Sequence, residues 1–202
     1  MESEATVFVV EDDGDIRASL GRLLEQVDLR VEEYGDAAAF LEASDPTRHG
    51  CLLLDVRMPG MSGTELQKRM LEMDISLPII FITAHGDVAM AVECMKRGAF
   101  EFLEKPVRAQ RLLDTIQRAL SLDRDRRATR VEIDEAKRCF SLLTPRESEV
   151  VELAVKGLTN RDIAGKLGVS SQAIDAHRLK ALQKLGVTNV ADLVRLAEKA
   201  KR

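Results

Sequence analysis

Aromatic residues are scarce in this chain of 202 residues, which has no tryptophan, one tyrosine and six phenylalanines. Its hydrophobic cores are therefore expected to be mainly aliphatic. The three cysteines lie far apart and lack the spacing of metal ligands, which indicates reduced thiols in a cytoplasmic protein. No apolar run approaches the roughly 20 residues that span a membrane, and the acidic amino terminus does not resemble a signal peptide. We expect no membrane partner.

The two halves of the chain differ in charge. Residues 1–120 contain 13 lysines and arginines against 22 aspartates and glutamates, whereas residues 121–202 contain 17 against 12. An acidic half joined to a basic half indicates separate tasks, and the basic half is the candidate for binding nucleic acid. The chain is long enough for two small domains.

Residues 51–63, CLLLDVRMPGMSG, combine an apolar strand with one carboxylate at its end. Four apolar residues without alternation predict a strand covered on both faces, as in a parallel sheet. Asp55 then lies at the carboxyl end of that strand, where open α/β sheets bind ligands. A carboxylate there can attack phosphorus and form an aspartyl phosphate. Taken alone, the stretch fits equally well an aspartate that only caps a turn.

Strands and helices alternate through the first half of the chain with short connections between them. This pattern predicts a doubly wound, five-stranded parallel sheet. The expected strands are 6–10, 31–34, 51–54, 78–82 and 99–103. The expected helices are 15–26, 36–43, one that passes through Leu66 and Met73, 87–97 and 107–120.

Polar side chains follow the ends of these strands. They are Asp12 and Asp13 after the first strand, Asp55 after the third, Thr83 after the fourth and Lys105 after the fifth. In a parallel sheet all of them line one edge, where three carboxylates would repel one another unless a cation intervenes. Such an oxygen-only site suits Mg²⁺. Thr83 can donate a hydrogen bond to a phosphoryl oxygen, and Lys105 supplies a positive charge.

With these residues the first half resembles the receiver domain of two-component response regulators. The resemblance covers about residues 5–120 and rests on four pieces of sequence, namely Asp12-Asp13, LLLDVRMPGMSG, Thr83-Ala84 and Lys105-Pro106. It implies a flavodoxin-like receiver in residues 1–120. It also implies that Asp55 accepts a phosphoryl group from a sensor histidine kinase, assisted by Thr83 and Lys105.

The same resemblance implies the metal ligands and the switch residues. Asp13, Asp55 and the backbone carbonyl of Arg57 would hold Mg²⁺, with Asp12 acting directly or through water. Thr83 and Phe102 occupy the switch positions, although Phe102 also fits an ordinary core aromatic. Phosphorylation would reshape the surface around the fourth helix, the fifth strand and the fifth helix, which forms the dimer contact in this family. Its candidate residues here are Met90, Val92, Met95 and Val107.

Residues 121–139 are strongly charged and contain neither glycine nor proline. Flexible tethers usually contain such residues, so we predict that the preceding helix extends into a semi-rigid, exposed helical linker. Its apolar residues do not form a heptad pattern, which leaves open whether it pairs with another copy.

Residues 140–202 predict a small all-α domain of four helices. Thr144 opens a capping box with proline at the first helical position, and Thr159 and Ser170 cap the next two helices. The two short helices joined at Gly168-Val169-Ser170 form a helix-turn-helix pattern. A helical bundle with a merely solvated polar face is the alternative.

The third of these helices has the pattern of a recognition helix for the major groove. The residues expected on its outward face are Gln172, Asp175, Ala176, Leu179 and Lys180. The flanking basic residues expected to meet phosphates are Arg161, Lys166, Arg178 and Lys184.

Nearly this whole half, from Leu143 to Val187, resembles the LuxR-type DNA-binding domain of the NarL and FixJ families. Asp175 and Leu179 depart from the family pattern, because many relatives have basic residues at those positions. An aspartate can accept a hydrogen bond from a cytosine amino group, and a leucine can contact a thymine methyl group. The DNA sequence bound by relatives therefore cannot be transferred to this chain.

The order of receiver, linker and helix-turn-helix domain looks most like the FixJ group. It implies a transcription factor that is phosphorylated on Asp55, forms a homodimer through the receiver and binds promoter DNA, with RNA polymerase as a further candidate partner. Such a protein is no metabolic enzyme and only catalyses its own phosphoryl uptake and loss. The alternatives are a DNA-binding regulator with a vestigial acidic site and a phosphatase with an aspartate nucleophile.

Overall fold

The computed structural model describes residues 5–84 and 88–201. The chain divides into two compact units, Met1–Arg126 and Arg127–Arg202. The expected start of a helix at residue 87 lies outside the described residues. Among the helices that are described, none combines the length and the apolar character needed to cross a membrane.

The first unit contains a five-stranded parallel sheet in the order β2-β1-β3-β4-β5, which confirms the predicted doubly wound α/β fold. Its strands are β1 (Thr6–Val10), β2 (Arg30–Tyr34), β3 (Gly50–Asp55), β4 (Ile79–Thr83) and β5 (Glu101–Glu104). Its helices are α1 (Gly14–Glu25), α2 (Ala37–Ala43), α3 (Gly63–Glu72), α4 (Val88–Lys96) and the first part of α5 (Ala109–Ser141).

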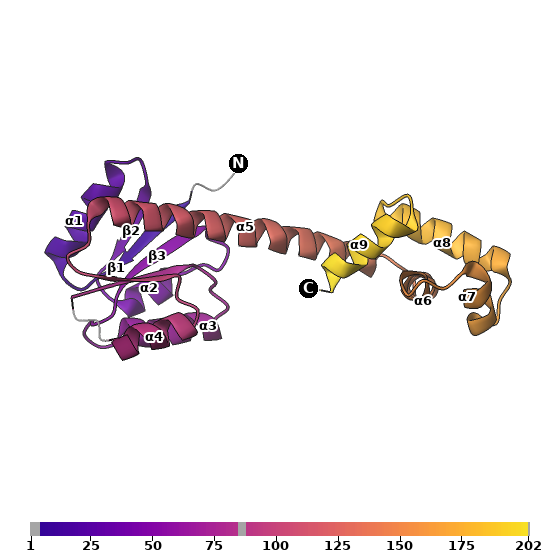
Figure 1. The fold of residues 1–202 in the computed structure, drawn as a ribbon, viewed down its shortest axis with the longest axis horizontal. Coiled ribbons are helices and arrows are strands. Elements are labelled where there is room, and N and C mark those ends of the chain that lie inside the picture. Colours follow the sequence, from indigo (N-terminus) through magenta and orange to yellow (C-terminus); the bar gives the residue numbers. More distant parts are fainter. Residues whose placement is uncertain (1–4, 85–87, 202) are drawn as a thin grey trace. The chain divides into compact units, whose positions relative to one another are not determined.

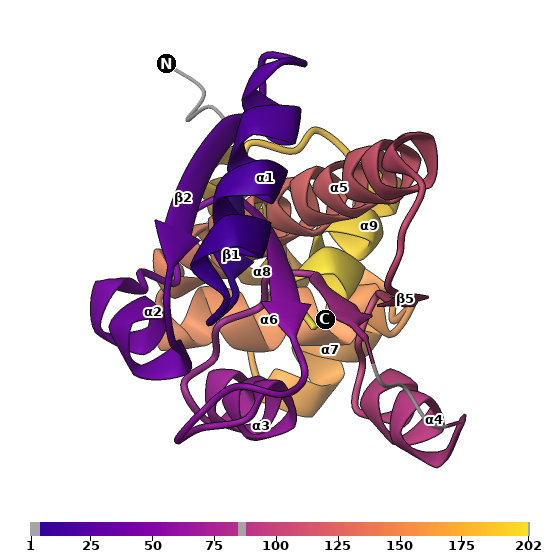
Figure 2. The ribbon, with the colours of Figure 1, turned by 90° about the vertical axis from the view of Figure 1, so that its left-hand side faces the viewer.

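Helices cover both faces of this sheet. Helices α1 and α5 lie on one face, and α2, α3 and α4 lie on the other (Figures 1 and 2). Along the central strand β3, Cys51 and Leu53 pack toward α1 and α5, whereas Leu52 and Leu54 pack toward the opposite helices. Both sets are buried, which is why this strand shows no alternation of apolar and polar residues.

Helix α5 extends the fifth receiver helix through the linker, as the sequence predicts. It runs without interruption for 33 residues and includes the whole predicted linker. Asp123 departs from the exposed helix expected there, because it is only 1% exposed. Its Oδ2 accepts hydrogen bonds from His49 Nδ1 at 2.6 Å and from the backbone nitrogen of Gly50 at 3.0 Å. This buried contact fixes α5 against the amino-terminal end of β3.

Four short helices follow in the second unit, as predicted. They are α6 (Pro145–Val155), α7 (Asn160–Leu167), α8 (Ser171–Leu185) and α9 (Val190–Ala200), and they enclose one aliphatic core. Thr144 forms the predicted capping box with Glu147. Between α7 and α8, Gly168 adopts a left-handed conformation with φ of 66°, which a side chain would disfavour. The chain therefore turns sharply into the Ser170 cap of α8.

Gly63, the first residue of α3, lies against the strand that ends at Asp55. A Cβ atom at Gly63 would stand 2.2 Å from the backbone oxygen of Asp55. We expect Gly63→Ala to lower the free energy of unfolding by about 1–3 kcal/mol, because strand and helix must move apart. Gly165→Ala is the matched control, since its Cβ would meet nothing within 4 Å and alanine favours the helix. Urea unfolding followed by circular dichroism measures both, and equal stabilities would contradict the prediction.

Candidate functional site

Three carboxylates converge at the carboxyl edge of the sheet. They belong to Glu11 and Asp12, which follow β1, and to Asp55, which ends β3. One oxygen from each lies within 4.8 Å of the others. Glu11 and Asp55 are 3% and 9% exposed, whereas Asp12 faces solvent. A cluster of carboxylate oxygens with one side open to water fits Mg²⁺, which keeps several of its waters when bound.

Asp13 has a different place from the one that the sequence predicts. It is the N-cap of α1, and its Oδ1 accepts hydrogen bonds from the backbone nitrogens of Asp15 and Ile16 at 2.9 and 3.1 Å. The structure therefore brings Glu11 into the carboxylate cluster in place of Asp13. A signal in the sequence could have revealed this shift of one residue, because an aspartate directly before a helix is a preferred N-cap.

Lys105 follows β5 and reaches the same edge. Its Nζ lies 2.7 Å from Glu11 Oε2 and 3.8 Å from Asp55 Oδ2. Its backbone nitrogen donates a hydrogen bond to the backbone oxygen of Thr83 at 2.8 Å, which fixes the backbone of Lys105 beside the end of β4. Asp55 Oδ1 accepts a hydrogen bond from the backbone nitrogen of Val56 at 2.8 Å. Glu11 thus holds the lysine beside Asp55, a role that the sequence did not reveal.

The two buried carboxyls of this cluster, those of Asp55 and Glu11, have raised pKa values. Burial raises the pKa of Asp55, although the charge of Lys105 and backbone hydrogen bonds from Val56 and Arg57 oppose this effect. Burial likewise raises the pKa of Glu11, opposed by its hydrogen bond to Lys105. One lysine faces three acids, so a divalent cation would relieve the remaining repulsion.

The two predicted switch residues lie on adjacent strands. Thr83, at the end of β4, is 1% exposed, and Phe102 on β5 is partly buried. The ring of Phe102 lies 6.1 Å from the ring of Phe81, centroid to centroid. In this conformation Phe102 therefore packs as part of the core, and Thr83 lies beside the acidic edge.

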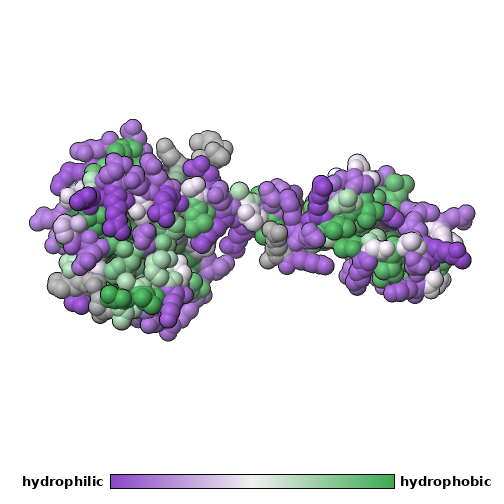
Figure 3. Space-filling view, in the orientation of Figure 1, coloured by the Kyte–Doolittle hydropathy of each residue, from purple (hydrophilic) through white to green (hydrophobic). Residues whose placement is uncertain are grey.

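The expected dimer surface is only partly exposed. The candidates Val92 and Met95 on α4 have 45% and 43% of their surfaces exposed, and Val88, which the sequence did not single out, has 81%. Apolar side chains gather over α4 in the space-filling view (Figure 3). The other two candidates, Met90 and Val107, pack against the two cores of the sheet. The apolar patch on α4 is thus made of Val88, Val92 and Met95.

The predicted outward face of α8 is exposed in the second unit. Its members Gln172, Asp175, Ala176, Leu179 and Lys180 all face solvent. The opposite face of α8 is buried in the core through Ile174, Ala181 and Leu185. Arg161 and Lys166, both on α7, are also exposed. A helix with one buried face and one open face can enter the major groove.

The two remaining basic residues are engaged within the domain. Arg178 Nη1 donates a hydrogen bond to Asn160 Oδ1 at 2.7 Å. Lys184 Nζ lies 2.7 Å from Glu147 Oε2 and donates to the backbone oxygen of Leu142 at 3.3 Å. Lys184 therefore links α8 to the start of α6, a contact between distant segments that the sequence did not reveal.

Glu147 makes the second unit sensitive to acid. Hydrogen bonds from Lys184 and from the backbone of Thr144 lower its pKa to about 2, from 4.5. Because the pKa of Glu147 is lower in the folded state than in the unfolded state, its ionised carboxylate stabilises the fold at pH values above 4.5. This stabilisation is lost as the pH falls from 4.5 to about 2. We expect wild type to be more stable than Glu147→Gln at pH 7, with a difference that vanishes across this window. Thermal unfolding followed by the methyl NMR signal of Ala154 measures it; a difference independent of pH would contradict the prediction.

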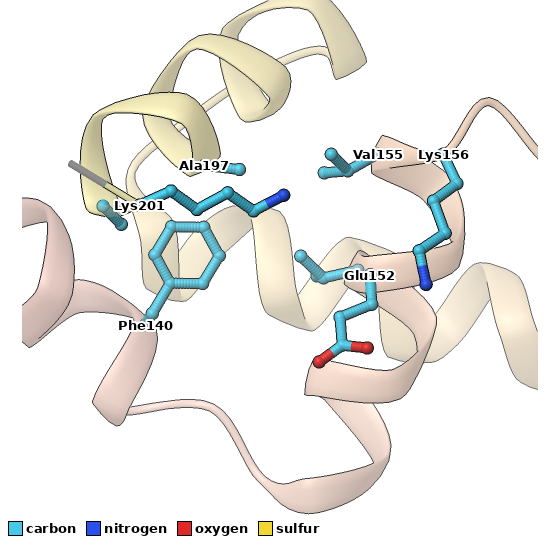
Figure 4. A pocket seen from close by; sticks show the side chains of 8 residues that line it. Phe140, Glu152, Val155, Lys156, Ala197 and Lys201 are labelled. Carbon is cyan, nitrogen blue, oxygen red and sulfur yellow. The ribbon is translucent and has the colours of Figure 1, made fainter.

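A cavity of about 360 Å³ lies between α6, α9 and the end of α5. Figure 4 shows Phe140, Val155 and Ala197 around it, with Lys201 extending across. None of the residues predicted for catalysis, metal binding or DNA contact lines this cavity. It therefore adds nothing to the acidic site or to the exposed face of α8.

Comparisons with known proteins match both units. Residues 7–117 match the response regulator receiver domain, and residues 141–197 match the luxR family of bacterial regulatory proteins. Nodulation protein W of Bradyrhizobium diazoefficiens is 41% identical over 97% of this chain and 86% of its own length. Transcriptional regulatory protein FixJ of the same species is 39% identical over 99% of this chain and 98% of its own length. The solved structure of the response regulator StyR is 47% identical, covers 97% of this chain and 99% of its own, and gives a TM-score of 0.88.

Proposed function

Because the chain belongs to the two-component response regulators with a LuxR-type DNA-binding domain, we propose that phosphorylation of Asp55 switches its binding to promoter DNA. The observation that carries the proposal is the convergence of Glu11, Asp12, Asp55 and Lys105 at one edge of the sheet. A regulator with a vestigial site could have lost any of these groups. The phosphatase alternative has less support, because a domain suited to DNA follows the receiver.

The transfer of the phosphoryl group to the protein depends on the two carboxylate oxygens of Asp55. Oδ1 accepts a hydrogen bond from Val56, so Oδ2, on the side of Lys105, is the oxygen placed to attack phosphorus. The new bond joins Oδ2 to phosphorus, while the bond from phosphorus to the histidine nitrogen of the kinase breaks. Lys105 then balances the charge of the phosphoryl group. Mg²⁺, held by Asp12, Asp55 and the backbone oxygen of Arg57, would supply charge neutralisation.

The response to phosphorylation involves the fourth strand and its neighbours. A phosphoryl group adds about −1.5 to −2 charge and strong acceptors next to Thr83. Rotation of the Thr83 hydroxyl toward that charge opens space on the side of Phe102, whose ring can turn inward. The apolar patch of Val88, Val92 and Met95 on α4 would then pair with the same patch of a second copy.

DNA binding would use the exposed face of α8. In a dimer, two copies of this helix reach two half-sites of one promoter. Once one copy is bound, the dimer contact holds the second copy near its half-site, so the dimer binds DNA more tightly than a monomer does. The receiver would thereby control DNA binding through association. An additional contact with RNA polymerase would fit a transcription activator.

Sedimentation velocity of the full chain with Mg²⁺, with and without acetyl phosphate, tests this function. We expect the donor to convert monomer to dimer and to tighten DNA binding at the same protein concentration. Wild type that is dimeric throughout and binds DNA equally well without the donor would support the alternative of a vestigial acidic site. Wild type that stays monomeric after confirmed phosphorylation would exclude receiver dimerisation as the switch.

Lys180 is an exposed base on the outward face of α8 and a candidate for a phosphate contact. We expect Lys180→Ala to weaken binding to all DNA sequences by a similar factor, and to reduce the salt dependence by about one released counterion. Fluorescence anisotropy over a series of salt concentrations measures this slope. An unchanged slope would remove Lys180 from the phosphate contacts.

A further inference from the structure

Asn160, the first residue of α7, connects two residues of α8. Its Nδ2 donates a hydrogen bond to Asp175 Oδ1, and its Oδ1 accepts one from Arg178 Nη1 at 2.7 Å. Asp175 and Arg178 are three positions apart, so they are neighbours on the helix surface. Among the residues that the structure describes, no ion pair joins this acid directly to this base. The amide of Asn160 stands between them and holds both.

The orientation of the amide follows from these partners. A guanidinium only donates hydrogen bonds, and a carboxylate only accepts them. Turning the amide over would direct its NH₂ group at Arg178 and its oxygen at Asp175, so both contacts would become repulsive. Asn160 therefore has one favourable orientation. The capping box of Thr159 with Asp162 holds the backbone from which it projects.

The contact restricts Asp175, which would otherwise be free to rotate on an exposed helix. With Oδ1 bound to Asn160, Oδ2 is the oxygen left to meet a hydrogen-bond donor in the groove. In the major groove a carboxylate oxygen favours cytosine, whose N4 amino group donates, over guanine, which presents acceptors. The Arg178 guanidinium on the same amide offsets part of the repulsion between Asp175 and DNA phosphates.

We infer that Asn160 is a positioning residue for base recognition, holding Asp175 toward the amino group of a cytosine in each half-site. The inference rests on the proposed DNA-binding function. Asn160 lies on α7, the first helix of the helix-turn-helix pair. It would act on base recognition through Asp175 and would touch no base itself.

Selection from DNA duplexes with randomised half-sites tests this inference, using the full chain with Mg²⁺ and acetyl phosphate. We expect wild type to prefer cytosine at one position by about 5- to 10-fold, and Asp175→Ala to lose this preference. Asn160→Ala should reduce it to less than about twofold at that position alone. Asn160→Asp should do the same, because aspartate keeps the acceptor for Arg178 but removes the donor to Asp175.

Two comparisons separate positioning from general damage. Lys180→Ala should weaken all sequences alike and keep the cytosine preference, and circular dichroism checks that each variant is folded. The inference is overturned if both Asn160 variants keep the cytosine preference, or if they lower affinity for every sequence equally. A wild type that selects no sequence would overturn the proposed function as well, so the two failures are distinguishable.

Discussion

Replacement of Asp55 by asparagine is expected to abolish phosphorylation of this protein and every response to a phosphoryl donor. The amide has almost the same shape but lacks the charge and the nucleophilic oxygen that attack phosphorus. Asp55 ends the buried strand β3, and Val56 donates a hydrogen bond to its Oδ1. Asparagine can accept the same hydrogen bond, so the variant should fold. Intact-mass spectrometry after incubation with acetyl phosphate and Mg²⁺ measures the phosphorylated fraction, which should fall below detection.

Asp13→Asn is the matched control for this experiment. It removes an acid from the same edge, but asparagine is as good an N-cap as aspartate and should preserve α1. We expect Asp13→Asn to be phosphorylated and to dimerise as wild type does. Phosphate-stimulated DNA binding that survives in Asp55→Asn would refute Asp55 as the switch.

The second large effect is expected on Mg²⁺ affinity. Asp12→Asn should weaken Mg²⁺ binding by about tenfold or more, because Asp12 is the solvent-facing acid of the carboxylate cluster and asparagine has no charge. Asp13→Asn should leave the Mg²⁺ affinity within about twofold of wild type, because all three carboxylates of the cluster and their charges remain. Isothermal titration calorimetry with Mg²⁺ on the full chain measures both values.

Comparing the Mg²⁺ affinities of Asp12→Asn and Asp13→Asn also decides between two sets of metal ligands. The sequence placed Asp13 and Asp55 on the ion, with Asp12 acting directly or through water. The structure instead places Glu11, Asp12 and Asp55 together and uses Asp13 as a helix cap. If Asp13→Asn weakens Mg²⁺ binding as strongly as Asp12→Asn, the first set is correct and the cap contact must break when the ion binds.

Much of this protein was predictable because its signals are local in the chain. Unbroken apolar runs such as the one before Asp55 indicate strands buried on both faces, and caps such as Thr144 and Ser170 mark where helices begin. Parallel strands end at one edge, so the meeting of Asp55, Thr83 and Lys105 follows from topology. The exposed face of α8 followed in the same way from helical periodicity.

Other features depended on contacts between segments that are distant in the chain. Glu11 joins the carboxylate cluster and holds Lys105, which lies 94 residues later, and Lys184 is paired with Glu147, 37 residues before it. Asp123 appeared to be one more charge of an exposed linker until His49 proved to be its partner. The sequence by itself determined the two domains' folds and the type of chemistry, because periodicity and caps act over a few residues. Only the tertiary structure decided which charges are paired, since a hydrogen bond depends on ångström distances between elements that no local pattern encodes.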